Sequence, residues 1–271
     1  MRRLILLLLA LLLVSPAAAF DWKDYDKGQR LDIRRFAVNN GLFTLYHEVG
    51  HLLIDKLELP VLGREEDAAD NIATWMLLQK GTPEANQALE DAVQGWALTA
   101  EYFDDRWTNE DFASGYSPDR QRAMQIVCLL VGADGAAFRP VADDYALNSD
   151  RQHMCHFEYE LIDRSMRQLL AKAASGTEVT VVYHDSGRHL KLAEQMLRNS
   201  GIIETVAEEV RRGYRLGGEV TMTVAQCGEP NAFYDTASAE IIFCYELMQD
   251  FVDLYADELP RQPTGKKPKS R

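Results

Sequence analysis

The sequence predicts an α+β protein that is mainly helical, with a small mixed sheet beside a helix that carries two histidines. Apolar residues recur at spacings of three, four and seven along residues 42–57 and in several later segments, which is typical of amphipathic helices. After Ser175-Gly176 the pattern changes to β-branched segments that alternate apolar and polar residues. Hydrophobic residues make up 46% of the 271-residue chain, which favours a substantial core over disorder.

The first half of the chain, residues 20–175, is expected to be helical. A short helix over 30–38 leads into the helix over 42–57, with Asn39-Asn40-Gly41 as a candidate cap and Pro60 closing the segment. We assign Trp96, within a later helix, no role beyond packing. The remaining predicted helices span 63–78, 84–104, 120–131 and 150–174, with a loop over 108–119 and a turn-rich segment over 132–140.

The second half, residues 176–258, supplies the sheet. Strands are predicted over 178–184, 219–226 and 240–245, and helices over 187–199, 202–212 and 246–257. The segment 228–235 is expected to be a turn-rich connection, and the strand over 240–245 is expected to be an edge of the sheet. The two halves are expected to form one domain over 20–258, and the Pro-rich basic tail over 259–271 is expected to be disordered.

The motif YHEVGH, residues 46–51, interrupts the apolar stripe of the first long helix. His47 and His51 are four residues apart, so on a helix they share one face and can hold one metal ion. Glu48 follows His47 and lies within reach of a water bound to that metal. Buried polar groups of this kind are costly unless a ligand satisfies them. The alternative is a helix with two exposed histidines and a solvated glutamate.

A catalytic zinc site takes three protein ligands and leaves one position open for water. A longer histidine motif is excluded, because its third histidine would be at Leu57 and its glycine at Ile54. Glu66 and Asp70 lie four apart on the next predicted helix, beside small alanines that let two helices approach closely. The alternative for this pair is a solvated charged face.

With these residues the chain resembles the gluzincin arrangement, in which one helix gives two histidines and the next gives a glutamate. The segments LYHEVGHLLI, LPVLGREEDAAD, CGEPNAFYD and CYEL resemble a bacterial metallopeptidase family of otherwise unknown function, over most of the mature chain. The resemblance implies a zincin-like fold, with one zinc ion held by His47, His51 and Glu66. It also implies Glu48 as the catalytic base and Asp70 as the support of a ligand histidine. Glu65 stays open as an alternative third ligand.

The order of these segments departs from that family. As the family is usually arranged, the NAFYD and CYEL segment precedes the HExxH helix, whereas here it follows. The chain is therefore similar to a circularly permuted member. A permutation requires the mature N-terminal segment and the helix over 246–257 to lie near each other.

The chain begins with the pattern of a cleaved export signal. Met1-Arg2-Arg3 precedes an apolar run over 4–14 and Ala17-Ala18-Ala19, so we expect cleavage after Ala19 and a periplasmic or secreted protein. An uncleaved membrane anchor is the alternative, but the run is short against the ~20 residues that a spanning helix needs. Loss of Arg2 and Arg3 takes the net charge from −13 to −15, which argues against nucleic acid or anionic lipid as a partner.

All four cysteines lie after the predicted signal. An even number in an exported chain favours two disulfides, out of three possible connectivities. The bonds Cys128–Cys155 and Cys227–Cys244 are preferred because each pair brackets one local unit, and free buried thiols are the alternative.

The expected function is hydrolysis of a peptide or protein substrate by a zinc-activated water, with Glu48 as general base. Tyr234 and His184 are candidates for the oxyanion stabiliser, with a structural role as the alternative for each. Two other classes stay open: a zinc-containing module that binds cell-envelope peptides without cutting them, and a structural zinc protein. The residues expected to line the cleft lie in the connection before the last strand: Asn231, Phe233, Tyr234 and Asp235.

Overall fold

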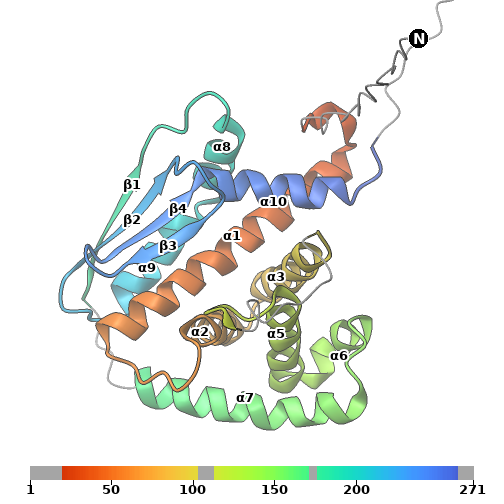
Figure 1. Cartoon of the computed structure of the whole chain (residues 1–271), viewed down its shortest axis with the longest axis vertical. Helices are drawn as coiled ribbons and strands as arrows, with labels where there is room; N and C mark the ends of the chain where they lie inside the picture. The colour runs from red at the N-terminus through yellow and green to blue at the C-terminus, as the bar shows by residue number, and fades with distance from the viewer. Residues whose placement is uncertain (1–19, 103–112, 171–175, 262–271) are drawn as a thin grey trace, which may run out of the picture.

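A single 30-residue helix, α1 (Lys27–Lys56), runs between the two halves of the protein in a computed structural model that describes residues 20–102, 113–170 and 176–261. Figure 1 shows the sheet with α8, α9 and α10 on one side of α1, and α2, α3, α5, α6 and α7 on the other. The mainly helical α+β class is confirmed, and the sheet lies beside the helix that carries His47 and His51. The expected signal over 1–19 and most of the tail over 259–271 lie outside the described residues.

The start of α1 differs from the prediction. The helix begins after Asp26, whose side chain forms a capping box with Gln29, and it continues without a break through Asn39-Asn40-Gly41. The expected short helix over 30–38 is therefore the first part of α1. Asn40 does not cap, because its side chain is buried and donates to the carbonyl of Asp91 in α3 at 3.0 Å. Gly41 leaves room for α10 to pack closely, since an added Cβ would lie 2.9 Å from the Met248 side chain.

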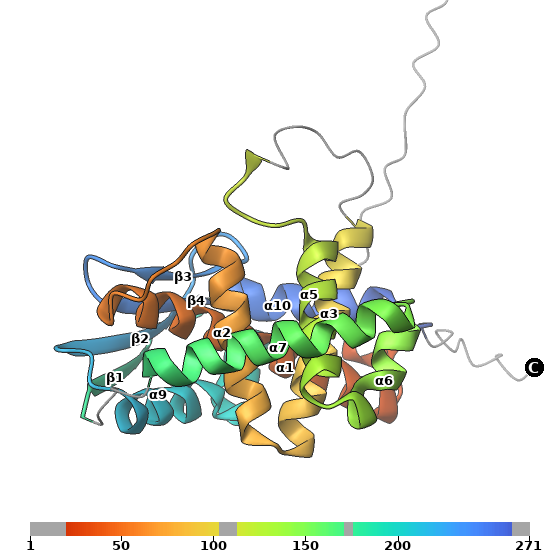
Figure 2. The ribbon, with the colours of Figure 1, turned by 90° about the horizontal axis from the view of Figure 1, so that it is seen from below.

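The helical half packs against the α2 and α3 side of α1. Gly81 ends α2 with a positive φ of 60° and Pro83 is the first residue of α3, positions that glycine and proline commonly take at helix ends. The expected turn over 132–140 is wrong, because Asp134 caps a helix there by accepting from the N–H groups of Ala136 and Ala137. The helices of this half are α2 (Glu65–Lys80), α3 (Pro83–Tyr102), α5 (Asp119–Ala133), α6 (Gly135–Asp144) and α7 (Ser149–Leu170). Figure 2 shows α7 lying across α2 and α5.

The second half holds a four-stranded sheet in the order β1-β2-β4-β3. The strands β1 (Glu178–Tyr183), β2 (Glu219–Ala225) and β4 (Glu240–Cys244) are parallel, and β3 (Ala232–Asp235) is antiparallel to β4. The helices are α8 (Lys191–Ser200), α9 (Ile202–Gly213) and α10 (Tyr245–Asp257). The register puts Val220, Met222, Ile241 and Phe243 on one buried face, and Phe243 reaches α1 at Gly41.

The prediction that the strand over 240–245 lies at an edge of the sheet is wrong. The strand β4 pairs with β2 on one side and with β3 on the other, so β3 is the edge beside it. The segment over 228–235 is therefore not only a connection, because its last residues form β3. Four residues are too few to show an alternating pattern, and the pairing depends on contacts with β4.

Both predicted disulfides are present. Cys128–Cys155 joins α5 to α7, and Cys227–Cys244 joins the segment after β2 to the end of β4. Each bond therefore fixes two elements that are close in the sequence, as the local pairing requires.

The N-terminal segment and α10 lie side by side. The Tyr25 hydroxyl donates to the carbonyl of Ala256 at 3.1 Å, and the Gln29 side chain donates to the carbonyl of Pro260 at 2.9 Å. The predicted proximity is confirmed, and the permutation itself stays a prediction. Within the described ranges, no helix is long and apolar enough to cross a membrane.

Candidate metal centre

Three side chains from α1 and α2 point to one place. The Nε2 atoms of His47 and His51 lie 3.1 Å apart, and Glu66 Oε2 lies 3.1 Å from the first and 3.6 Å from the second. His47 and His51 are one turn apart on α1, and Glu66 is in the first turn of α2. Within the described part of the chain, this is the one group of three or more His, Cys, Asp or Glu side chains close enough to hold a metal ion.

Carboxylates hold the opposite nitrogen of each imidazole. His47 Nδ1 lies 2.8 Å from Asp70 Oδ1, and His51 Nδ1 lies 2.9 Å from Glu65 Oε1. In a neutral imidazole whose Nδ1–H donates to a carboxylate, Nε2 carries a lone pair. Lone pairs of His47, His51 and Glu66 then face one another, which is unfavourable unless a cation lies between them. Glu65 is thus placed beside His51 Nδ1 and away from the convergent atoms.

The electrostatics of the group favour positive charge. Burial opposes the charged form of His47, but hydrogen bonds with Asp70 and Glu66 outweigh it and raise the pKa of His47 to about 9. Burial alone would raise the pKa of Glu66, yet the hydrogen bonds with both histidines hold the pKa of this carboxyl well below its usual range. The carboxylates therefore create a site that a proton or a metal cation can neutralise.

Close packing of α1 on α2 brings the three groups together. A Cβ added to Gly50 would lie 2.9 Å from the Cα of Ala69 and 3.1 Å from its carbonyl oxygen. The expectation that small residues let the two helices approach closely is confirmed. Gly50 directly precedes His51, so this close contact between α1 and α2 lies beside a histidine of the group.

Glu48 lies beside this group without a partner. Its residue is only 4% exposed, and among the described residues no hydrogen bond or ion pair to its carboxylate is present. Its oxygens are not among the fully buried atoms that lack a partner, so they keep some contact with solvent. Burial raises the pKa of Glu48, while the neighbouring His47 and His51 act to lower it. A nearly buried carboxylate without a protein partner, beside two histidines, is typical of a group that handles protons.

Asp70 also binds a residue that the sequence analysis did not single out. Arg122 Nε lies 2.6 Å from Asp70 Oδ2, and Arg122 Nη2 lies 2.8 Å from Asp70 Oδ1. Both side chains are buried. The two residues are 52 positions apart, and Arg122 is one of several polar residues at the start of α5, so no local pattern predicts this contact.

Tyr116 is a second residue that the sequence analysis missed. Its loop is held to the start of α2 by a hydrogen bond from Arg64 to Ser117 at 3.0 Å. The charge of Glu66 is the main cause that raises the pKa of the exposed Tyr116 phenol. The signal in the sequence was only a tyrosine in a predicted loop.

The expected oxyanion candidates have other partners. The Tyr234 hydroxyl donates to Asp55 Oδ2 at 2.7 Å, and the backbone carbonyl of His184 accepts from Tyr245. In the described residues, no hydrogen bond joins Tyr234 or His184 to His47, His51 or Glu66. The predicted cleft residues Asn231, Phe233, Tyr234 and Asp235 lie in and before β3, and Phe233 is exposed.

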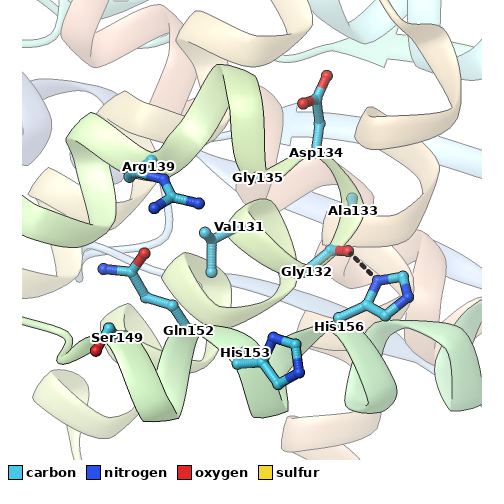
Figure 3. Close-up of a pocket in the computed structure, with 10 residues that line it drawn as sticks. All are labelled: Val131, Gly132, Ala133, Asp134, Gly135, Arg139, Ser149, Gln152, His153 and His156. Carbon is cyan, nitrogen blue, oxygen red and sulfur yellow. Dashed lines mark hydrogen bonds between the residues drawn. The ribbon is translucent and has the colours of Figure 1, made fainter.

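His153 and His156 lie apart from this centre, as surface polar groups. Figure 3 shows both on α7, lining a pocket of about 530 Å³ with Arg139 and the end of α5. His156 Nδ1 contacts the carbonyl of Gly132 at 3.2 Å, and Nε2 lies 3.3 Å from Glu160. Both histidines are exposed, and neither belongs to the group of side chains that could hold a metal ion.

Comparison with known proteins gives one match. The model of a protein family described as "Putative metallopeptidase" matches residues 14–170 and 183–267, which is most of the chain. No curated protein matches the chain. No solved structure matches it. The matched segments include the convergent histidines and glutamate of α1 and α2, and the chain belongs to this metallopeptidase family.

Proposed function

We propose that the protein is a zinc-dependent peptidase, with one zinc ion held by His47, His51 and Glu66. The observation that carries the proposal is the convergence of three donor atoms at mutual distances of 3.1, 3.1 and 3.6 Å. Zinc ligands at about 2.0–2.1 Å in a tetrahedron are separated from one another by about 3.3 Å. The spacing and chemistry of the donors therefore fit the ion.

The number of protein donors also suits a catalytic site rather than a structural one. Structural zinc sites use four protein ligands, whereas catalytic sites use three and leave one position for water. A zinc ion bound here would lower the pKa of a bound water to about 7 and polarise a substrate carbonyl.

Residues around the proposed zinc ion would then have separate roles in hydrolysis. Glu48, which is unpaired, would accept the proton of the attacking water and pass it to the leaving nitrogen of the peptide. Asp70 would hold His47 through Nδ1, and Glu65 would hold His51 in the same way. Each contact fixes which nitrogen of the imidazole faces the site. Glu65 is thus proposed as a support and Glu66 as the ligand.

The edge strand β3 is the proposed wall for the substrate. An edge strand has free backbone N–H and C=O groups on one side, and an extended peptide can pair with them. The hydrogen bond from Tyr234 to Asp55 ties β3 to α1 one turn beyond His51. We therefore propose that a peptide substrate lies along Asn231–Asp235, beside the proposed zinc ligands.

Substitutions within the motif test the proposal. Glu48→Gln should keep zinc and lose hydrolysis of an unfolded protein substrate, because Glu48 does not contact the metal. Glu66→Ala should lose zinc, since it removes one of three ligands, while Glu65→Ala should only weaken binding, by roughly ten- to a hundredfold. Metal content and cleavage are measured on the same purified samples. Full zinc retention in Glu66→Ala would remove this residue from the ligand set.

The same samples separate catalysis from binding. A wild-type chain that binds one zinc ion but cleaves no unfolded protein would instead favour the peptide-binding or structural alternatives. Loss of cleavage only in Glu48→Gln, with zinc retained, would exclude both of them.

We also propose that the protein is exported and that residues 20–258 form one unit. The two disulfides support an oxidising compartment, where such bonds persist. N-terminal sequencing of the protein recovered outside the cytoplasm should begin at Phe20. A chain that keeps Met1 after export would contradict cleavage.

A further inference from the structure

The guanidinium of Arg122 is held between an acid and an aromatic ring. On one side, two nitrogens of Arg122 bind both oxygens of Asp70, at 2.6 and 2.8 Å. On the other side, Arg122 Cζ lies 3.6 Å from the centre of the Trp96 ring. Asp70 in turn binds His47 at 2.8 Å. Contacts therefore run from α3 through α5 and α2 to the histidine on α1.

We propose that Arg122, seated on Trp96, is a positioning residue that orients Asp70 and, through it, the imidazole of His47. The inference rests on the proposed function, because the effect of the positioning is to aim His47 Nε2 at the metal. It assigns a role to Arg122 and to Trp96, neither of which lies next to the histidine motif in the sequence.

The hydrogen bonds fix the plane of the Asp70 carboxylate. Oδ2 accepts from Arg122 Nε, while Oδ1 accepts from Arg122 Nη2 and also lies against His47 Nδ1. A fork of two parallel N–H groups determines direction as well as distance, which a lysine ammonium does not do. Without the fork, the carboxylate of Asp70 can rotate about its terminal torsion, and the His47 ring loses its fixed partner.

Trp96 fixes the position of the guanidinium itself. The face of an indole attracts a cation and covers it from water, so the contact with Trp96 holds the guanidinium in place beside Asp70. Arg122 is only 7% exposed and Asp70 only 3%. The pair is therefore desolvated, and its geometry is set by packing rather than by chance contact at a surface.

Zinc affinity is the quantity that tests the proposal, measured by competition with a chromophoric chelator. Arg122→Lys keeps the charge and removes the fork, and should weaken Zn²⁺ binding roughly tenfold, as for groups that orient metal ligands. Trp96→Leu leaves the fork present but unsupported, and should weaken binding by a smaller factor. Arg120→Lys is the matched control, because Arg120 is an exposed arginine on the same helix, and it should leave the affinity unchanged.

A double variant separates positioning from a general loss of structure. If Arg122 acts through Asp70, then Asp70→Asn with Arg122→Lys should bind Zn²⁺ no more weakly than Asp70→Asn alone. Losses that simply add would overturn the proposal. So would an Arg122→Lys affinity equal to that of the wild type.

Folding is checked by circular dichroism on every variant. A cavity of about 210 Å³ beside Asp70 and Arg122 gives water room to solvate a shorter lysine, so Arg122→Lys should fold. If it does not, Trp96→Leu decides, since unchanged Zn²⁺ affinity in that variant overturns the proposal. A wild-type chain without Zn²⁺ affinity overturns this inference and the proposed function together, whereas unchanged affinity in the variants overturns only this inference.

Discussion

Gly50→Ala is expected to weaken the metal site without touching any ligand. The added Cβ would lie 2.9 Å from the Cα of Ala69, where ordinary contacts begin at 3.4 Å. The neighbouring atoms are backbone, so the clash cannot be relieved by a side-chain rotation. The helix α2 must therefore move away from α1 by about 0.5 Å or more, and Glu66 moves with it.

Two terms of opposite sign decide the stability of this variant. Alanine is better than glycine in a helix by about 1 kcal/mol, and overpacking a close contact costs about 1–3 kcal/mol. The net expectation is a loss of about 1 kcal/mol in the free energy of unfolding. Because positioning within about 0.5 Å matters in such sites, the affinity for Zn²⁺ should fall roughly tenfold or more.

Urea unfolding of the metal-free protein and chelator competition measure the two effects. The matched control is Gly213→Ala at the end of α9, where an added Cβ meets nothing within 4 Å and φ is not positive. The control should be neutral or slightly stabilised and should keep its Zn²⁺ affinity. A Gly50→Ala protein that is more stable than the wild type and binds Zn²⁺ equally well would refute the reasoning.

Three further predictions follow from the packing around this site. Replacing Cys128 and Cys155 by serine should cost on the order of 3 kcal/mol in urea unfolding, by the loop-entropy estimate, and an unchanged midpoint would contradict it. Tyr234→Phe should cost about 0.5–1 kcal/mol near neutral pH. Its hydrogen bond lowers the pKa of Asp55, so this contribution is present above about pH 4 and disappears as the pH falls further. Equal pH dependence of stability in wild type and variant would argue against that link. A chain that ends at Ser175 should be insoluble or molten, because it exposes the face of α1 that the sheet and α10 cover; cooperative unfolding of that fragment with zinc bound would show two separate domains.

Patterns of neighbouring residues in the sequence predict the elements of this protein that depend mainly on neighbouring residues. Most helices could be predicted because their apolar faces repeat over several turns. The error at Asn39-Asn40-Gly41 has a tertiary cause. These residues are those of a helix cap, but Asn40 is used to bind α3 and Gly41 to admit α10. At both positions, contacts with other helices determine the local structure, and the tendency of these residue types to end a helix does not.

In the candidate site, too, some residues can be predicted from the sequence and others cannot. His47, His51 and Glu66 were predicted because two of them share a helical spacing and the third belongs to a recognisable segment on the next helix. Arg122 binds Asp70 from a position far along the chain, and the pKa of Tyr116, also distant in sequence, is raised mainly by the charge of Glu66. Neither residue type is distinctive in its own segment. Contacts of this kind depend on how helices cross, which a single sequence does not specify.

The chain maintains its site against a cost in stability. Glu48 is a nearly buried carboxylate, and His47, Asp70 and Arg122 are buried polar groups that form hydrogen bonds with one another. Replacing such groups by apolar residues of similar size is often neutral or stabilising in proteins, so stability alone does not explain them. Their arrangement is explained if a cation completes it, because a ligand that binds only the folded state stabilises that state, by an amount that grows with the logarithm of its affinity. On this argument the rigid surroundings of α1, with α3 and α5 behind Asp70 and β3 bound at Asp55, exist to hold an unfavourable cluster in the geometry that binding requires.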